Sequence, residues 1–269
     1  MKPTLQRARS AFDSHLEIKP LPEKLGFRFG EEVFGGGNTE YRSLREIRGS
    51  LLDADCAGPD PVYAIAMGVG RAEHERELRK RNLLFGVVLY AAGRLGREPV
   101  RSQGHVHAIS PNCGWSAPEL IEVWEGCAIV YLQQHAGDDP GHCIAITAAP
   151  GQQVVIPPGW AHCVINADER SRMMFGAFCN VEYGFEYAAV RMRGGLAWYP
   201  LLAADGEIIW QENPRYGASH LASRGARPYP ELGLAPAVPV YQQFAQAPDR
   251  LQWVADPGRL KNLWRQFIP

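Results

Sequence analysis

Residues 151–166 read GQQVVIPPGWAHCVIN, and this stretch decides the fold. Pro150 and Gly151 favour a tight turn before a short apolar run. Pro157, Pro158 and Gly159 then break that run and form a corner, because proline is confined to the ends and edges of strands. The stretch fits the spacing G-x5-P-x-G-x2-H-x3-N at five fixed positions: Gly151, Pro157, Gly159, His162 and Asn166. It predicts two strands joined by a corner, with His162 facing inward.

Two further histidines occur earlier, in the segment GHVH at residues 104–107. Side chains two positions apart on a strand point to the same face, so His105 and His107 should lie side by side. The segment PELIEVWEG at 118–126 places Glu119 at the start of the next predicted strand. Glu122 lies three residues further on and should point to the opposite face. We therefore expect Glu119 to lie beside the histidines. Glu122 should lie at the surface or support the inward-facing residues from outside the cluster.

These four side chains predict a metal site. Three neutral imidazoles and one carboxylate suit Fe(II), Mn(II), Ni(II) or Zn(II). Four ligands on one side of a six-coordinate ion leave positions for water or substrate, which is typical of a catalytic site. We expect one divalent ion per chain, Fe(II) first and Zn, Ni or Mn as alternatives. Its predicted ligands are His105, His107, Glu119 and His162.

The pattern around these motifs predicts an all-β fold. From 83 to 212, short β-branched and aromatic runs alternate with Gly, Pro, Asn and Asp. Many short strands at this spacing indicate an antiparallel sandwich or barrel. We expect one structural domain in which residues 1–82 form an N-terminal extension packed on the barrel of 83–212. Residues 213–269 would wrap the barrel and end in a helix.

Helices are expected in three short places. Residues 43–55 carry apolar side chains at helical spacing behind Ser43, which is a suitable N-cap. Residues 187–193 predict one helical turn. Asp256 and Pro257 resemble an N-cap followed by a first-turn proline, and they should open the C-terminal helix.

Composition limits the partners and the compartment. The chain has 28 Lys and Arg against 29 Asp and Glu, a formal net charge of −1, which gives no electrostatic case for nucleic acid or an anionic membrane. The first residues lack the apolar region of a signal peptide, and the apolar run at 83–92 is too short to cross a bilayer. The six cysteines form no CxxC pair, so we expect reduced thiols and a cytoplasmic protein.

The two histidine segments and the Glu119 strand together resemble the two motifs of cupins. The chain is similar to the cupin-type glucose-6-phosphate isomerase family of archaea and bacteria, from about residue 40 to 250. The segments EYAAVRMRGGLAWYPL at 186–201 and DGEIIWQENPRY at 205–216 carry the family resemblance, since generic cupins lack them. The resemblance implies a jelly-roll-like barrel, a metal on the four ligands, interconversion of glucose 6-phosphate and fructose 6-phosphate, and a homodimer.

The resemblance also implies roles for the neighbouring residues. Phosphate contacts would come from Ser102, Gln103 and Gly104, with Arg101 beside them. Tyr187 matches a tyrosine that the family places in the site. The proton would be moved by Glu119 or, failing that, by Glu186 or Tyr187, although a direct hydride shift fits the same ligands.

The chain departs from the family pattern at several positions. Eleven residues separate His107 from Glu119, where three or four are usual, and this insertion should form a loop at the barrel mouth. Phe185 replaces a histidine of some members, and Ile121 and Cys179 replace tyrosines. These changes leave two alternatives: another metal-dependent cupin enzyme, such as an Fe(II) dioxygenase or a different sugar-phosphate isomerase or epimerase, and a metal or sugar sensor. No helix-turn-helix pattern in 1–80 supports the sensor.

Overall fold

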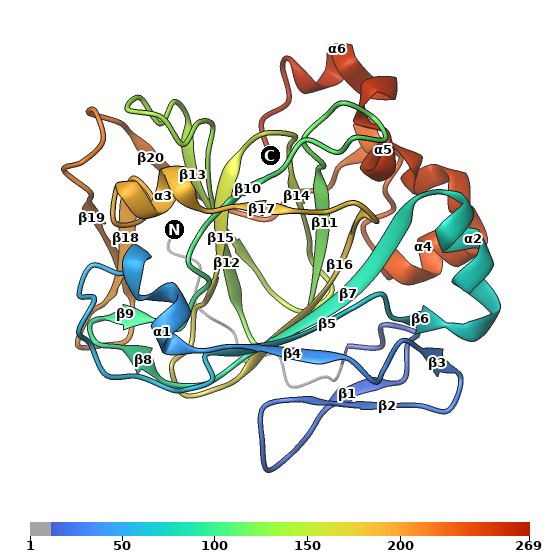
Figure 1. The fold of residues 1–269 in the computed structure, drawn as a ribbon, viewed down its shortest axis with the longest axis horizontal. Helices are drawn as coiled ribbons and strands as arrows, with labels where there is room; N and C mark the ends of the chain where they lie inside the picture. The colour runs from blue at the N-terminus through green and yellow to red at the C-terminus, as the bar shows by residue number, and fades with distance from the viewer. Residues whose placement is uncertain (1–11) are drawn as a thin grey trace.

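The computed structural model describes residues 12–269, whose body is a pair of facing β-sheets (Figure 1). The larger sheet has six strands in the order β14-β11-β16-β7-β5-β4, and all its neighbouring strands are antiparallel. The smaller sheet has four strands in the order β15-β12-β13-β20, of which only β13 and β20 are parallel. The larger sheet comprises β4 (Thr39–Arg42), β5 (Tyr63–Met67), β7 (Leu83–Tyr90), β11 (Glu119–Glu125), β14 (Gln153–Ile156) and β16 (Met173–Asn180). The smaller comprises β12 (Ala128–Gln133), β13 (Cys143–Ala148), β15 (Ala161–Asn166) and β20 (Leu221–Gly225).

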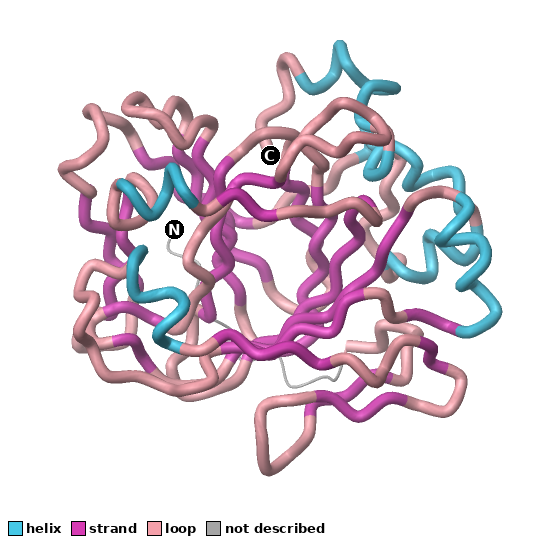
Figure 2. The backbone as a smooth tube through the Cα atoms, viewed as in Figure 1, coloured by secondary structure: helices cyan, strands magenta, loops and turns pink. Residues whose placement is uncertain are grey.

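Short strand pairs and helices surround the two sheets (Figure 2). The pairs are β1 (Ile18–Pro20) with β2 (Phe27–Phe29), β3 (Val33–Phe34) with β6 (Gly70–Arg71), β8 (Arg94–Leu95) with β9 (Glu98–Pro99), β10 (Val106–His107) with β17 (Phe185–Glu186), and β18 (Trp198–Leu202) with β19 (Ile208–Glu212). The α-helices are α1 (Leu44–Ile47), α2 (Glu75–Lys80), α3 (Ala188–Met192), α4 (Val240–Gln246), α5 (Gln252–Ala255) and α6 (Lys261–Trp264). The 3-10 turns are Arg48–Ser50, Ala72–His74, Pro230–Leu232, Pro248–Leu251 and Pro257–Leu260. Within residues 12–269, every helix is too short or too polar to cross a bilayer.

The predicted all-β, jelly-roll-like class is confirmed, and the sheets also include strands outside the predicted barrel range of 83–212. Strands β4 and β5 precede residue 83 and extend the larger sheet through the β5–β7 ladder. Strand β20 follows residue 212 and forms an edge of the smaller sheet. In the part of the chain that the structure describes, no ladder joins the two sheets into a closed barrel. The two facing sheets therefore take strands from all three predicted segments.

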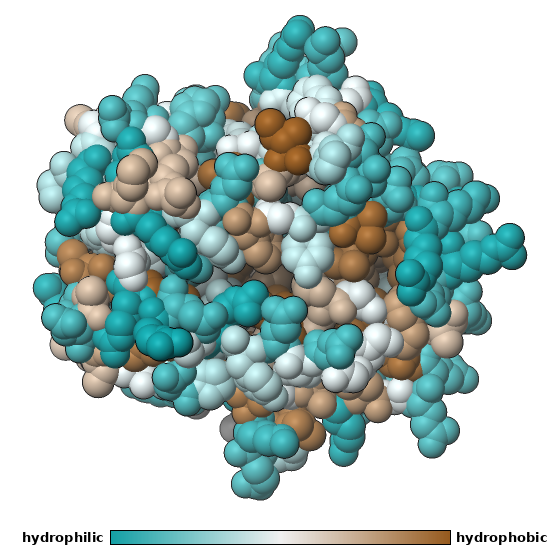
Figure 3. Space-filling view, in the orientation of Figure 1, coloured by the Kyte–Doolittle hydropathy of each residue, from teal (hydrophilic) through white to brown (hydrophobic). Residues whose placement is uncertain are grey.

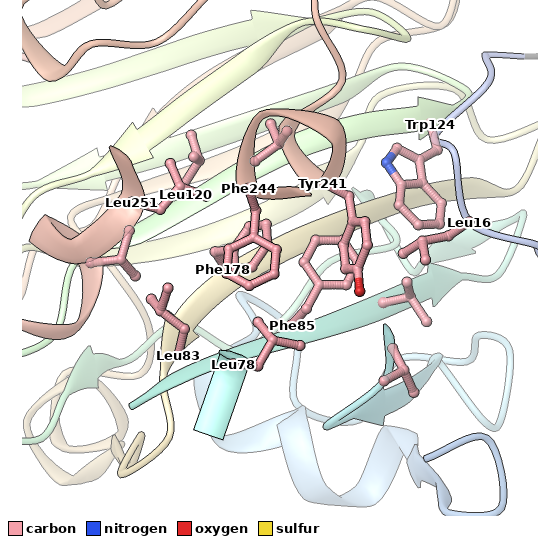
Figure 4. Packing of buried hydrophobic residues seen from close by; sticks show 14 of the residues in the cluster. Leu16, Leu78, Leu83, Phe85, Leu120, Trp124, Phe178, Tyr241, Phe244 and Leu251 are labelled. Atoms are coloured by element: carbon pink, nitrogen blue, oxygen red, sulfur yellow. The ribbon is translucent and has the colours of Figure 1, made fainter. Parts of the chain in front are cut away.

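Alternating side chains divide the larger sheet into two faces. On β7, Phe85, Val87 and Leu89 belong to a core that continues into the C-terminal helices. In that core Phe178 of β16 packs against Tyr241 and Phe244 of α4, with ring centroids 6.0 and 5.4 Å apart (Figure 4). The residues between them in sequence face the smaller sheet, and there they line a cavity. The predicted C-terminal wrap is thus a cover over the outer face.

The predicted helices form, but they are shorter than expected. Ser43 caps α1 in a capping box with Glu46, and the helical path ends at Ser50 rather than at residue 55. Helix α3 matches the predicted turn at 187–193. At the C-terminus Pro257 opens a 3-10 turn before α6, and the side chain of Asp256 makes no cap hydrogen bond.

Glu122 lies on the outer face of β11, opposite Glu119 as expected, but it is buried rather than at the surface. Its carboxyl accepts hydrogen bonds from the backbone N–H of Val240 (2.9 Å) and from Nε1 of Trp124 (3.2 Å). Burial raises the pKa of Glu122 to about 8, and these hydrogen bonds oppose the shift. Glu122 therefore anchors the start of α4 to the sheet.

All six cysteines are free thiols. Burial raises the pKa of Cys127 to about 11 and that of Cys163 to about 12, because the apolar surroundings penalise the thiolate. Cys56, Cys143, Cys163 and Cys179 are buried and behave as small apolar side chains.

Candidate metal centre

The three predicted histidines converge inside the cavity between the sheets. His105 and His162 face each other in an antiparallel bridge, with backbone N–H···O distances of 3.1 and 3.0 Å. His107 follows on β10, which pairs with β17 (Figure 1). One ring nitrogen of each histidine lies within 4.8 Å of the others. The two motifs are therefore brought together as the sequence predicted, and the three imidazoles could hold one metal ion.

Hydrogen bonds to backbone carbonyls orient two of the rings. Nδ1 of His107 lies 2.8 Å from the carbonyl oxygen of Ala117, and Nδ1 of His162 lies 3.2 Å from that of Trp160. A carbonyl accepts, so each Nδ1 carries the proton and each Nε2 presents a lone pair to the centre. Such carbonyl contacts are a usual support for metal-binding histidines.

The electrostatics of the site favour neutral imidazoles. Burial and, after it, the neighbouring histidines lower the pKa of His105 well below its ordinary value and that of His107 to about 4. Within residues 12–269, Nε2 of His105 and Nε2 of His162 are buried atoms without a hydrogen-bond partner. Buried polar atoms normally have a partner, and a divalent ion would supply one. The residues present therefore fit a metal ion.

Glu119 opens β11 beside these rings. Its Oε2 lies 3.5 Å from Nε2 of His107 and 3.6 Å from Nε2 of His162, and its side chain is 16% exposed. The insertion before it links both motifs through Ser116. The Ser116 hydroxyl donates to the carbonyl of His107 (2.7 Å) and accepts from the N–H of Gly159 (3.0 Å).

The cavity that holds the histidines has both apolar and polar walls. Inner-face side chains of β5, β7, β15 and β16 form its walls, which are apolar at Ile65, Met67, Val88 and Phe175. Sequence reasoning missed three polar residues that line it: Arg42, Tyr63 and Tyr183. Arg42 and Tyr63 lie on β4 and β5, and alternation shows which way they point only once the pairing of β4 with β5 and of β5 with β7 is known. Tyr183 lies in a loop and gives no such signal.

The predicted phosphate residues separate into two groups. Ser102 lines the cavity, and its hydroxyl accepts a hydrogen bond from the N–H of Val164 (3.1 Å), which leaves its own proton to donate. Gly104 has φ +90°, where an added Cβ would meet Leu196 at 2.9 Å, so this position requires glycine. Gln103 is buried beside them and accepts a hydrogen bond from Arg191 (2.9 Å).

Arg101 is the exception, because its position does not favour the predicted phosphate contact. Its side chain is buried and does not line the cavity. The guanidinium donates to Glu98 (2.6 Å) and to the carbonyl oxygens of Ser102 (2.9 Å) and Ser50 (2.6 Å). These bonds hold the charge of Arg101 in the protein interior, outside the cavity lining.

Tyr187 and Glu186 also lie differently. Tyr187 lines the cavity, with its ring centroid 5.7 Å from that of His105. Glu186 is exposed and does not line the cavity, because neighbouring residues of an extended strand point to opposite sides. This position does not favour its predicted role as an alternative base. Of the three family departures, Phe185 and Cys179 line the cavity, whereas Ile121 lies in the core.

The model of the family described as glucose-6-phosphate isomerase (GPI) matches residues 49–217, more than half of the chain. The chain belongs to this family. The metal-centre residues His105, His107, Glu119 and His162 all fall inside the matched range, whereas Arg42 lies before it.

Glucose-6-phosphate isomerases of archaea are among the relatives. That of Thermococcus kodakarensis is 25% identical over 191 residues, which cover 68% of this chain and 90% of the relative. That of Pyrococcus horikoshii is 26% identical over 203 residues, covering 74% of this chain and 97% of the relative. Nearly the whole length of each relative is therefore matched within this longer family member.

Solved structures overlap with part of the fold. An oxalate oxidase shares 18% identity over 46% of this chain and 54% of its own, with a TM-score of 0.33. An oxalate decarboxylase from B. subtilis shares 14% identity over 61% of this chain and 33% of its own, with a TM-score of 0.35. Both scores are below 0.5, so the chemistry of those enzymes is not transferred to this family member.

Proposed function

We propose that the chain interconverts glucose 6-phosphate and fructose 6-phosphate with one divalent ion per chain. The observation that supports this most is the meeting of His105, His107 and His162 in one cavity of a glucose-6-phosphate isomerase family member. Glu119, with Oε2 3.5 and 3.6 Å from two of the rings, would be the fourth ligand. Membership of the family also supports a homodimer, a phosphosugar as the partner and a cytoplasmic location, and these remain proposals.

The ligand set is compatible with Fe(II), Mn(II), Ni(II) or Zn(II), and we propose Fe(II) first. The ion would polarise the two substrate oxygens between which the double bond moves and would stabilise the charge that develops on them. The neutral state of His105 and His107 keeps their lone pairs available for this ion near pH 7.

The protein's own task is to move a proton between C1 and C2 of the sugar. Among residues 12–269, Glu119 is the only carboxylate that lines the cavity, so it is the strongest candidate for the base. Burial raises the pKa of Tyr187, although Arg42 and Arg191 oppose the shift. The Tyr187 hydroxyl therefore stays protonated and can donate to a sugar oxygen. The apolar walls keep water from the reacting carbons.

The test is a coupled isomerase assay on protein stripped with a chelator and then supplied with Fe, Mn, Ni or Zn separately. We expect no activity in the stripped protein and recovery with at least one ion. Activity that survives complete metal removal would contradict the proposal. Running the reaction in deuterated water adds a second readout: label in the product supports proton transfer through a base, and unlabelled product supports a direct shift.

The cavity walls favour one alternative, another metal-dependent cupin enzyme. Phe185 and Cys179 replace polar residues of some family members and line the cavity beside Ile65 and Met67. This makes the cavity less polar than a sugar would prefer. Oxygen uptake by the Fe(II)-loaded protein, without isomerase activity, would favour the alternative.

A further inference from the structure

One cation lies in the cavity that holds the metal centre. Among the residues that line it within 12–269, Arg42 is the only arginine or lysine. Arg42 ends β4, where it is paired in register with Tyr63 of β5, another lining residue. It lies before the range 49–217 that the family model matches. Its position is therefore a feature of this chain's fold rather than of the matched motifs.

Arg42 is free to exchange its partner. Its NH2 donates to Oε2 of Glu40 at 3.1 Å, and the two side chains are 23% and 59% exposed. An ion pair this open to water contributes little and is readily replaced. Arg101 differs, because it is buried against three fixed partners and does not line the cavity.

Several polar groups line the cavity together with Arg42. They are the hydroxyl groups of Tyr63, Ser102, Tyr183 and Tyr187. The guanidinium of Arg191 stacks on the Tyr187 ring at 4.9 Å from the centroid. Arg191 also donates to Gln103 (2.9 Å), the neighbour of Ser102. The cavity lining therefore offers one charged fork and several hydroxyl groups as well as the three imidazoles.

We propose that Arg42 binds the phosphate of the substrate, with the Ser102 hydroxyl as a second donor, and so makes the site specific for phosphorylated sugars. This inference rests on the proposed function. A guanidinium matches a phosphate dianion because its planar fork forms two parallel N–H···O bonds. With the phosphate on Arg42 the sugar would extend toward the histidines, so that its first two carbons reach the metal centre.

The experiment measures binding, independently of turnover. Isothermal titration of the metal-loaded protein uses 6-phosphogluconate as the probe and gluconate, which lacks the phosphate, as its control. The variants are Arg42→Gln and Arg42→Lys. The matched control is Arg45→Gln, since Arg45 is an exposed arginine three residues away on α1 that does not line the cavity. Metal content and the melting temperature establish that each variant is folded.

We expect Arg42→Gln to weaken binding of 6-phosphogluconate roughly 10- to 100-fold, the loss typical of a hydrogen-bonded charged partner. Gluconate binding should change less than about 2-fold, because that ligand does not use the charge. Arg42→Lys should lie between, since it keeps the charge but loses the fork. Arg45→Gln should bind as the wild type does.

Two outcomes overturn the inference: wild-type protein that binds both probes equally, and Arg42 variants that bind 6-phosphogluconate as tightly as the wild type. If Arg42→Gln does not fold, Arg42→Lys is the test variant. The inference is contradicted if Arg42→Lys binds 6-phosphogluconate with the affinity and the salt dependence of the wild type. The proposed function fails separately, if no metal restores isomerase activity while binding of 6-phosphogluconate still depends on Arg42.

Discussion

On the inner face of β7, Gly86, Val88 and Tyr90 line the metal cavity, whereas on its outer face Phe85, Val87 and Leu89 pack under the C-terminal helices. The same division continues on β16, where Ala177 and Cys179 face inward and Phe178 faces outward. Adjacent residues of one strand thus serve binding and stability separately. Substitutions on the two faces should therefore affect different measurements.

Outside the sheets, the face shown in Figure 3 is mainly hydrophilic, with isolated apolar patches. Large exposed apolar side chains such as Ile109 (68% exposed) and Met192 (72% exposed) lie on the 108–118 loop and on α3, two segments near β10 and β17 (Figure 1). The buried apolar side chains of the sheets lie in the cavity walls, under the C-terminal cover, and where the smaller sheet packs against α3 and the β18–β19 pair.

The largest effect is expected on the inner face. His162→Ala removes one of three convergent imidazoles, so metal content should fall and isomerase activity should drop at least about 100-fold. The melting temperature should change little beyond the loss of the ion. Elemental analysis measures the metal content and the coupled assay measures the isomerase activity. The control is His135→Ala, because His135 is exposed on the loop after β12. Stoichiometric metal in His162→Ala would contradict the ligand assignment.

The outer face gives the opposite prediction. Phe178→Ala leaves a cavity among Phe85, Tyr241 and Phe244. It should lower the free energy of unfolding by about 3–5 kcal/mol, measured by urea titration. Metal stoichiometry in the folded protein should stay at one. The control is Ile209→Ala, since Ile209 is 50% exposed and should change stability by less than about 0.5 kcal/mol. Loss of metal by folded Phe178→Ala would show that the two faces are not independent.

Glu122 adds a pH dependence to the outer face. Because its pKa of about 8 exceeds the ordinary value of 4.5, the folded state holds the proton more tightly than the unfolded state. Its contribution is complete below pH 4.5 and is lost as the pH rises toward 8, at up to about 1.4 kcal/mol per pH unit.

Glu122→Gln removes this titration, but it replaces one carboxyl oxygen, a hydrogen-bond acceptor, by an NH2 group, which donates. The variant should be about 1–3 kcal/mol less stable than the wild type at pH 5, and the difference should shrink toward pH 9. Urea titrations across this range measure it, with exposed Glu125→Gln on the same strand as the control. A difference that grows with pH would mean that Glu122 is ionised in the folded state.

The smallest effect concerns the insertion between His107 and Glu119. Ser116→Ala breaks the link from His107 to Gly159. We expect metal affinity to fall by about 10-fold, the lower end for groups that orient ligands. Competition with a chromogenic chelator measures this, and Ser223→Ala on exposed β20 is the control. Unchanged affinity would show that the insertion does not position His107.

The sequence predicted what depends on regular periodicity and fixed spacing. His105, His107 and His162 meet because strand alternation fixes which way each side chain points. Two predicted site residues, Arg101 and Glu186, lie outside the cavity. Strand alternation gives no orientation for the first and was not applied to the second. Arg101 follows the short β9 strand, and its orientation is set by Glu98, which sequence spacing alone did not reveal. Glu186 follows Phe185 on β17, and adjacent residues of a strand point to opposite faces, so Phe185 lines the cavity and Glu186 does not.

The boundary at residue 82 failed for a different reason. Strands β4 and β5 are separated by α1 and irregular chain, and only their pairing with β7 identifies them as part of the larger sheet. Long-range pairing is not encoded in local patterns. Arg42 was missed in the same way, because its place in the cavity depends on where β4 lies.

Anomalous diffraction at the absorption edge of the bound metal tests the central claim most directly. The account predicts one peak per chain, at about 2.0–2.2 Å from Nε2 of His105, His107 and His162 and from a carboxylate oxygen of Glu119. A peak that lies elsewhere, or one whose shell omits two or more of these atoms, would contradict the account.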